Sequence, residues 1–476
     1  MADRRKKKQT IAKEFEITIT PWEGIVFSQD PYTIPENMAV WIEGLPKLTG
    51  AIEAVPYCSS LATVTSPKHI RAFSLSDDYI SVLRLDQLNM VYYWAVYRSD
   101  GSCVGECQVP LVKPKHDIAV QGNTACWVTG RASPGQTFLR TFDGTNLRDL
   151  SQYGVGGDAI CYWKGRIFVG NNRTLTFSVP NPDYTGGTNP FNTANGAGYI
   201  DINLGSFSKI LALIPKEDSI YILTDNNIIA LLGTTISNDP TQWYLTEIMS
   251  GYGISDAGMW TKYEHTIYYH SPVGVLSLVA TVPEKIDDAV TIRTGVPQYV
   301  RDIGWFVYQG VPYVAVISER FDLSEHAIYC YNMLIKRWYA IPINCSSVTS
   351  IRDITYVATN TAILKLFGSS SSYYGVKVLS KVFFNDANIY YNIRKIHLYG
   401  RGGSSIGLKF INESRQQTLL ACNTLSNPDF FLNTYYFPQA LANRCKQFQL
   451  ALEQIDHQYS ELISVKIKGT LGARYV

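Results

Sequence analysis

The chain has 476 residues, of which 46% are hydrophobic and only 17% charged, and its 42 Lys+Arg nearly balance its 40 Asp+Glu. Soluble proteins usually carry about a quarter charged residues. The low charge, together with 32 Tyr and 35 Gly, therefore argues against coiled coil, helical solenoid and intrinsic disorder. We expect a folded, β-rich protein.

The start of the chain is basic. Five positive side chains stand there against the single carboxylate of Asp3, namely Arg4, Arg5, Lys6, Lys7 and Lys8. These five residues are the candidate contacts to a partner or to DNA, and the alternative is a disordered solubilising end. Because no apolar stretch follows, we expect no secretory signal. Because no run approaches the roughly 20 apolar residues of a membrane helix, we also expect folding in a cytoplasm without membrane insertion.

A short aromatic strand, a turn and a second strand recur along the chain. We predict strand pairs at residues 91–97 and 103–109, 124–128 and 136–144, 165–169 and 174–179, 219–223 and 228–232, 266–270 and 274–278, 312–317 and 327–331, and 354–357 and 362–366. The units start about every 35 to 55 residues, as four-stranded propeller blades do. The sequence therefore predicts a β-propeller of six or seven blades over residues 61–370, with an irregular pair of β-sandwiches as the alternative.

The segments outside the repeat differ in pattern. Residues 180–205 are rich in Pro, Gly and Asn, so we expect a long loop that contacts a neighbouring subunit or a channel. Longer alternating strands after residue 370 predict a C-terminal β-sandwich over residues 371–476. Residues 1–60 are expected to form an N-terminal extended arm. The predicted fold class is thus all-β, a propeller with an additional sandwich.

The motifs of catalysis and metal binding are missing. The Gly-rich stretch 154–157 precedes a strand rather than a helix, which argues against dinucleotide binding, and no Gly-x-Ser-x-Gly elbow is present. His265 and His270 are expected on opposite sides of one strand, and Cys103 and Cys107 within another. The nine cysteines are expected to be mostly buried free thiols. We therefore predict no catalytic, cofactor-binding or metal residue and no enzymatic activity.

A glycan-binding or glycan-cleaving propeller of the sialidase type is the alternative function. The abundant Tyr and Trp would allow sugar rings to stack on aromatic faces. The repeated Ser-x-Asp-x-Gly-x-x-Trp turn of that class is absent, because the turns at 99–101 and 142–144 keep only Asp-Gly. We therefore place this function second.

Several passages carry a resemblance to a known family. They are Gln-Thr-Phe-Leu-Arg-Thr-Phe-Asp-Gly-Thr-Asn-Leu-Arg-Asp-Leu at 136–150, Lys-Gly-Arg-Ile-Phe-Val at 164–169, Tyr-Gly-Ile-Ser-Asp-Ala-Gly at 252–258, Ser-Pro-Val-Gly-Val at 271–275, the closing strand at 462–469, and the start at 32–38 with 44–48. The chain thereby resembles the propeller tail hub (nozzle) proteins of short-tailed bacteriophages, also called packaged-DNA stabilisation proteins.

The resemblance implies a mechanical role in a virion. Such proteins form homo-oligomeric rings, generally hexamers, below the head-to-tail connector and its adaptor ring. They enclose the DNA exit channel, retain packaged DNA and anchor tail fibres, spikes or a needle. The resemblance thus implies a virion tail protein assembled in the bacterial host cytoplasm, with double-stranded DNA passing without sequence specificity. The near-neutral body fits this role, because a strongly basic wall would hold DNA during ejection.

Overall fold

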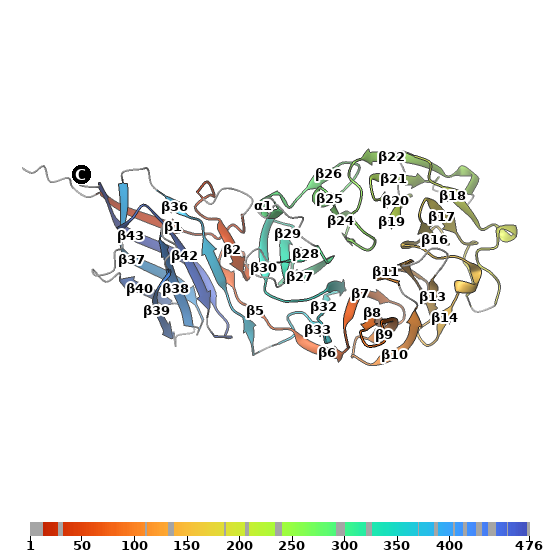
Figure 1. Cartoon of the computed structure of the whole chain (residues 1–476), viewed down its shortest axis with the longest axis horizontal. Helices are drawn as coiled ribbons and strands as arrows, with labels where there is room; N and C mark the ends of the chain where they lie inside the picture. The colour runs from red at the N-terminus through yellow and green to blue at the C-terminus, as the bar shows by residue number, and fades with distance from the viewer. Residues whose placement is uncertain are drawn as a thin grey trace, which may run out of the picture.

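The computed structural model describes most of the chain. The described residues are 13–26, 32–109, 112–131, 138–184, 187–204, 209–233, 240–291, 300–319, 326–369, 371–384, 389–402, 405–412, 417–424, 431–436, 444–454 and 456–473. They form two all-β units side by side, a propeller and a sandwich (Figure 1).

The propeller has seven blades within the described residues. Six of them are separate four-stranded sheets, and the remaining one, the sixth along the chain, is the four-stranded start of a larger sheet. The first three blades are β7 (Pro67–Ser74), β8 (Asp78–Asp86), β9 (Val91–Arg98) and β10 (Cys103–Val109); β11 (Val112–Gln121), β12 (Thr124–Arg131), β13 (Leu139–Phe142) and β14 (Leu147–Asp149); and β15 (Ala159–Trp163), β16 (Arg166–Asn171), β17 (Thr174–Phe177) and β18 (Gly198–Asp201).

The next three blades repeat this meander. They are β19 (Ile210–Lys216), β20 (Ser219–Thr224), β21 (Asn227–Leu232) and β22 (Tyr244–Ser250); β23 (Trp260–Tyr263), β24 (Thr266–Ser271), β25 (Gly274–Leu278) and β26 (Pro283–Lys285); and β27 (Asp302–Tyr308), β28 (Val311–Glu319), β29 (His326–Asn332) and β30 (Arg337–Ile341). The turns fit the predicted hairpins, since Gly101 and Asn172 adopt positive φ of 91° and 52°. The prediction of an all-β propeller with six or seven blades is confirmed.

The seventh blade closes the ring with strands from both ends of the propeller. It consists of β31 (Ser347–Ile351), β32 (Ile354–Ala358), β33 (Ala362–Lys365) and, as its outer strand, β6 (Ser59–Thr63). Ala62 pairs with Ile363 across this closure. Because β6 precedes the first blade in the chain, its pairing joins the last blade to the first and closes the propeller.

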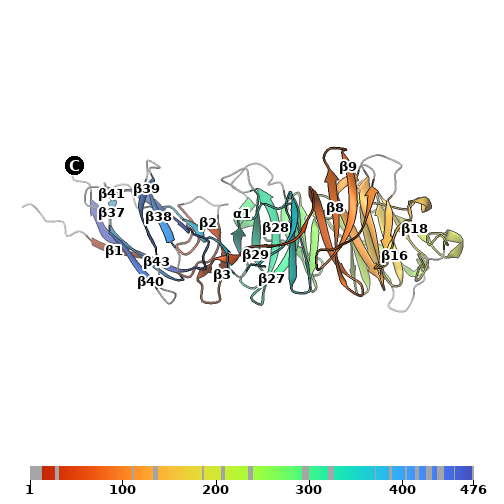
Figure 2. The ribbon, with the colours of Figure 1, turned by 90° about the horizontal axis from the view of Figure 1, so that it is seen from below.

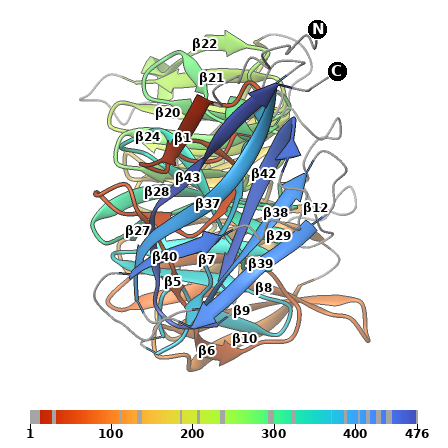
Figure 3. The same cartoon turned by 90° about the vertical axis from the view of Figure 1, so that its left-hand side faces the viewer.

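The sandwich contains two packed sheets (Figure 3). One sheet has the order β3-β4-β43-β37-β40, with β1 and β41 also paired to it, and the other continues β2-β35-β42-β38-β39, with β36 paired to β42. The strands are β1 (Lys13–Ile19), β2 (Ala39–Glu43), β3 (Leu45–Pro46), β4 (Ile52–Glu53), β35 (Lys377–Ser380), β36 (Phe383–Phe384), β37 (Ile389–Arg401), β38 (Ser405–Asn412), β39 (Gln417–Thr424), β40 (Phe431–Tyr436), β41 (Arg444–Cys445), β42 (Gln447–Gln454) and β43 (Glu461–Ala473). Alternation in β42 buries Phe448, Leu450 and Leu452 between the sheets.

The two units share a continuous sheet. Strand β2 pairs in parallel with β30 of the sixth blade, through Glu43 and Ala340, and antiparallel with β35 of the sandwich. The result is a ten-stranded sheet that runs from the propeller into the sandwich. Figure 2 shows β2 at the junction of the two units. One hydrophobic core also spans both units, from Tyr329 in the propeller through Trp41 to Leu452 in the sandwich.

Two expectations need correction. Residues 1–60 were predicted to form an extended arm, but their described part supplies strands to the sandwich and the start of the closing strand β6. Strands such as β3 and β4 could not be predicted, because two residues are too few to show an alternating pattern. The predicted loop over 180–205 includes β18, which completes the third blade, and the segment buries Phe191 against that blade.

Within the described residues, the longest helix is α1 (Asp288–Thr291), and no helix is long and apolar enough to cross a membrane.

Candidate functional site

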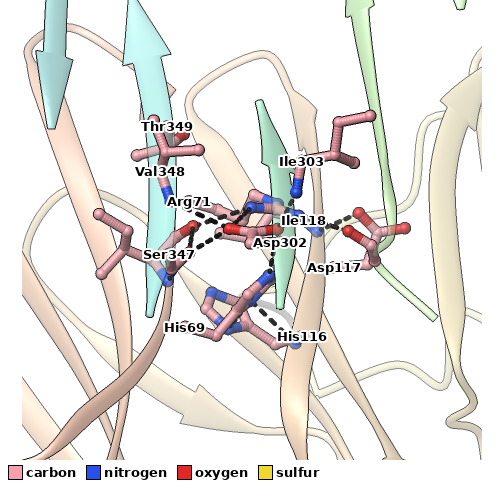
Figure 4. Close-up of polar contacts among 12 residues, drawn as sticks. His69, Arg71, His116, Asp117, Ile118, Asp302, Ile303, Ser347, Val348 and Thr349 are labelled. Carbon is pink, nitrogen blue, oxygen red and sulfur yellow. Dashed lines mark hydrogen bonds and ion pairs between the residues drawn. The ribbon is translucent and has the colours of Figure 1, made fainter. Parts of the chain in front are cut away.

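Polar side chains gather where the inner strands of the blades converge on the propeller axis. We call these residues the axial cluster: His69, Arg71, Lys113, Lys115, His116, Asp117, Asp158, Lys209, Asp256, Asp302 and Ser347. They come from β7, β11, β27 and β31 and from the segments just before β15, β19 and β23, so every blade contributes. Figure 4 shows the part of the cluster around Asp302.

The Asp302 carboxylate is the most heavily bonded group of the cluster. Both guanidinium nitrogens of Arg71 lie 3.2 Å from its two oxygens, a bidentate pair. The Ser347 hydroxyl and the backbone N–H of Val348, at 3.0 Å, also donate to it (Figure 4). Burial alone would raise the pKa of Asp302, but the charge of Arg71 outweighs burial and holds this pKa well below its usual value. Asp302 therefore stays ionised, and from the sixth blade it bonds to Arg71 of the first blade and to Ser347 and Val348 of the seventh.

A chain of hydrogen bonds connects the first two blades. The backbone N–H of His116 donates to Nδ1 of His69 over 3.2 Å, so this nitrogen is an acceptor and the proton of neutral His69 sits on Nε2. Nδ1 of His116 then donates to the same atom over 3.0 Å, which leaves Nε2 of His116 to accept from Ser81 over 2.8 Å. Trp94 donates in turn to Ser81 over 2.6 Å. Every group in this chain is neutral, and Nε2 of His69 faces Asp302 at 3.6 Å.

Burial keeps the two histidines neutral. It lowers the pKa of His69 to about 4 against the opposing influence of Asp302, and it lowers the pKa of His116 well below the usual value. Both rings are almost fully buried, and they meet edge to face with centroids 4.8 Å apart. The two histidines therefore have a structural role and are not exposed groups that could act as an acid or a base.

The second, third and fourth blades are joined by ionic contacts. The Asp158 carboxylate lies 3.2 Å from Nζ of Lys113 and 3.2 Å from Nζ of Lys209. Nζ of Lys113 also lies 3.8 Å from Asp256, which belongs to the segment before the fifth blade. Asp117 accepts from the backbone N–H of Ile160 in the third blade over 3.2 Å, and burial raises the pKa of Asp117 to about 6.

The segment 254–259 leads from the fourth blade into the fifth and contacts the first blade. The carbonyl oxygen of Gly258 accepts from Arg71 over 2.6 Å. Gly258 has a positive φ of 70°, a backbone conformation that glycine adopts without strain. This glycine lets the main chain lie against the cluster. The axis is therefore occupied by protein at this level rather than left as an open pore.

The residues singled out from the sequence have different outcomes. Arg4, Arg5, Lys6, Lys7 and Lys8 lie outside the described residues. His265 is exposed in the turn after β23, whereas His270 lies on β24 with Nδ1 2.6 Å from the Ser255 hydroxyl.

The cysteine motif lies on a strand, and the Gly-rich stretch precedes a strand, as predicted. Cys103 and Cys107 are both on β10, and the Gly-rich stretch leads into β15. No group of metal-ligating residues was found within the described part of the chain, and the described cysteines are free.

The axial cluster itself was not predicted, although one signal for it exists. Pro-Lys-His occurs twice, at 67–69 and at 114–116, and the two histidines are 47 residues apart, close to one repeat. Equivalent positions of successive blades meet at the axis, so a polar residue repeated at blade spacing identifies the cluster.

The burial of His270, which lies outside the axial cluster, makes the stability of the chain depend on pH. Burial, aided by Lys115, lowers its pKa to about 4, so the unfolded chain binds one more proton than the folded chain between about pH 6.5 and pH 4. Stability should fall as the pH falls through this range. In His270→Asn, whose amide oxygen can replace Nδ1 as acceptor, we expect this loss to shrink by about 1–3 kcal/mol.

Urea unfolding at several pH values between 4 and 7 measures this difference. The control His265→Asn changes an exposed histidine and should leave the pH dependence as in the wild type. Equal slopes for His270→Asn and the wild type would contradict the assignment of a neutral His270.

Comparisons with known proteins add a fold likeness only. No protein-family model matches the chain, and no curated protein matches it. Similar solved structures include the sialidase of Trypanosoma rangeli in complex with 2,3-difluorosialic acid, with 8% identity over 91% of this chain and 97% of that chain and a TM-score of 0.33. The β-propeller domain of the Trilobed protease from Pyrococcus furiosus has 9% identity over 66% of this chain and 94% of that chain and a TM-score of 0.34.

Another similar structure is larger than this chain. The extracellular domain of a hybrid two component system from B. thetaiotaomicron has 11% identity and a TM-score of 0.33, and the match covers 79% of this chain. The chain spans about half of its length, since the match covers 49% of that domain. At these identities and TM-scores the likenesses carry no argument about activity, substrate or partner. The chain is a β-propeller with an attached sandwich on the evidence of its own sheets.

Proposed function

We propose that this chain is a structural virion protein, a subunit of the tail hub or nozzle ring of a short-tailed bacteriophage. In this role it extends the head-to-tail connector, retains packaged DNA and anchors tail fibres or spikes. The sequence resemblance supplies the class, and the observation that carries the proposal is the ten-stranded sheet that fuses the propeller to the sandwich.

The fused sheet supports a mechanical role. Trp41 on β2 is buried between the units, where its ring meets Tyr329 of the sixth blade edge to face at 5.6 Å. Its indole N–H donates to Glu43 on the same strand over 2.8 Å. Hydrogen-bonded strands and a shared core resist rotation of one unit against the other far better than a flexible linker would. A ring subunit that transmits force between a connector and a fibre needs this stiffness.

The filled axis bears on the path of DNA. Arg71, Gly258 and Asp302 lie in direct contact there, so the propeller does not supply a conduit of its own. In the proposed ring, double-stranded DNA therefore passes between subunits and not through a propeller.

The axial cluster supports the proposal that the protein is not an enzyme. Most glycoside hydrolases use two carboxyl groups that face the substrate, whereas sialidases use a tyrosine nucleophile. Within the described cluster, Asp302 is engaged by Arg71, Asp158 by Lys113 and Lys209, and Asp256 by Lys113. Asp117 is 5% exposed and accepts from backbone N–H groups. Each of these carboxylates is thus engaged by a cation or by backbone N–H groups.

Glycan binding is the second candidate function. Tyr199 on β18 and Tyr244 on β22 are 66% and 59% exposed on the outer strands of adjacent blades. Exposed aromatic faces are the surfaces on which sugar rings stack. If the chain binds glycans, a glycan array should show specific retention that is lost in Tyr199→Ala or Tyr244→Ala.

Deletion of the gene in its own virus tests the hub proposal. Particles that lack the chain are expected to lose packaged DNA and to carry no fibres or spikes, and supply of the wild-type chain should restore both. Full infectivity and DNA retention without the chain would contradict the proposal.

A second complementation tests the basic arm. In this variant Arg4, Arg5, Lys6, Lys7 and Lys8 are all changed to Gln. Normal assembly with leaking DNA would assign the arm to phosphate contact, because each neutralised phosphate contributes to affinity. Failed assembly would assign it to an acidic adaptor, which we favour because the rest of the chain is net negative. Normal assembly and retention would leave the arm as a solubilising end.

A further inference from the structure

One turn of the first blade presents apolar side chains to solvent. Leu88 and Met90 lie in the turn between β8 and β9, where Leu88 is 95% exposed. The Asp86 carboxylate holds this turn, because it accepts from the backbone N–H of Leu88 over 3.0 Å and from the side-chain amide of Asn89 over 2.9 Å. Residues 86–90, which we call the knob, therefore project two apolar side chains from a turn with a defined shape.

A pocket of about 430 Å³ lies where the sixth blade meets the sandwich. Trp22, the β3–β4 turn and the β29–β30 turn line it. Among the lining residues, Leu48, Leu334 and Ile335 are each more than half exposed, so apolar surface borders the pocket. Exposed apolar surface around a concave site is typical of a contact with another protein.

The pocket lining also contains a donor without an acceptor. The indole N–H of Trp22 is buried and donates no hydrogen bond within the described part of the chain. An unpaired buried donor costs free energy. A turn of another chain would bring backbone carbonyl groups together with apolar side chains, so it matches this pocket better than a purely apolar ligand does.

The charges of the knob and the pocket are compatible. Arg337 lines the pocket and has no carboxylate partner among the described residues. Asp86 in the knob is ionised, since the hydrogen bond from Asn89 lowers the pKa of Asp86. Glu23 also lines the pocket, so charge sets the orientation in which Asp86 meets Arg337, and the apolar residues supply the affinity.

The knob and the pocket lie on opposite faces of the propeller. Successive turns of an antiparallel blade alternate between its two ends. The turn of the knob follows the second strand of its blade, and the β29–β30 turn follows the third strand of its own, so the two turns are on opposite faces. In Figure 2 the hairpin of β8 and β9 reaches the upper edge of the propeller, whereas β3 lies nearer the lower edge. One copy can therefore contact a second copy without using the same surface on both.

We propose that the knob of one copy of this chain docks in the pocket of a second copy, with Leu88 seated against Leu334 and Ile335. The contact is head to tail, so repeated copies form a ring where the rotation closes and a filament where it does not. It rests on the proposed function, because it names the contact between subunits of the proposed ring. A single turn buries little surface, so the contact is expected to be weak in a pair and stronger in a closed ring, where each subunit makes two contacts.

Sedimentation velocity of the full chain, from about 5 to about 200 μM, tests the contact. We expect the mean mass to rise with concentration. Leu88→Asp and Ile335→Asp should each weaken association by at least about tenfold, because a charge replaces an apolar side chain on one side of the contact. The control Val273→Asp places the same charge in the β24–β25 turn, on the face that carries the knob, and should change association less than about twofold.

Mixing the two variants tests the direction of the contact. Leu88→Asp keeps its pocket and Ile335→Asp keeps its knob, so the equimolar mixture should form dimers and nothing larger. Wild-type chain that stays monomeric at about 200 μM, undiminished association of either variant, or a mixture whose assemblies are not dimers would each overturn the proposal.

The same measurements separate this contact from the hub proposal. A purified chain that is monomeric but forms a ring in the virus would remove only this contact. A chain that associates as expected but is absent from virus particles would remove only the hub.

Discussion

Replacement of Asp302 by Asn is expected to lower the free energy of unfolding by about 3–5 kcal/mol, the usual effect of removing one member of a buried ion pair. The variant leaves Arg71 beside a neutral amide, and that amide presents donors to Ser347 and Val348 that already donate. Because Asp302 bonds to the first and seventh blades from the sixth, the loss affects the closure of the ring. Urea unfolding followed by tryptophan fluorescence measures it.

The matched control is Asp256→Asn. The Asp256 side chain is 47% exposed, and its contact with Lys113 is 3.8 Å long, so we expect a change of at most about 1 kcal/mol. The double variant Arg71→Met with Asp302→Asn should be more stable than the sum of the single effects predicts, since it removes the orphaned charge. If Asp302→Asn were no more destabilising than Asp256→Asn, the axial cluster would not hold the blades together.

Replacement of Trp41 by Ala is expected to cost about 3–5 kcal/mol and to separate the unfolding of the two units. Trp41 is 1% exposed on the strand that joins the sixth blade to the sandwich, and the cavity would open at this joint. We expect the wild type to unfold in one calorimetric transition because the units share one core. Trp41→Ala should show two transitions.

Tyr199→Ala serves as the control for Trp41. It also removes an aromatic ring, but from a 66% exposed position on β18, so the single transition should persist with a change below about 1 kcal/mol. If Trp41→Ala unfolded in one transition with the same free energy of unfolding as the wild type, the packing of Trp41 would not hold the propeller and the sandwich together.

Local patterns made the blades predictable. The hairpin of the first blade, β9 with β10, could be predicted because an apolar, aromatic-rich run precedes the turn residues Asp100-Gly101 and a second strand-like run follows them. The same logic identified β24 with β25, where Gly274, at a φ of 131°, begins β25 directly after the turn residues Pro272 and Val273. In these cases the residues that specify the turn are neighbours in the sequence, so the information is local.

Pairings between distant residues could not be predicted. The closure of β6 on β33 joins Ala62 to Ile363, and the joint of the units pairs Glu43 with Ala340. Such pairings depend on the finished ring and not on a turn. The contact of Arg71 with Asp302 spans 231 residues in the same way. Only the repeated Pro-Lys-His at His69 and His116 offered a local signal for the axial cluster.

Electron cryomicroscopy of intact virus particles, combined with the copy number of the chain per particle, tests the central proposal most directly. The account predicts several copies in a ring below the head-to-tail connector, with rigidly joined propellers and sandwiches and with DNA passing between subunits. Absence of the chain from the particles, or its presence in one copy, would contradict a hub.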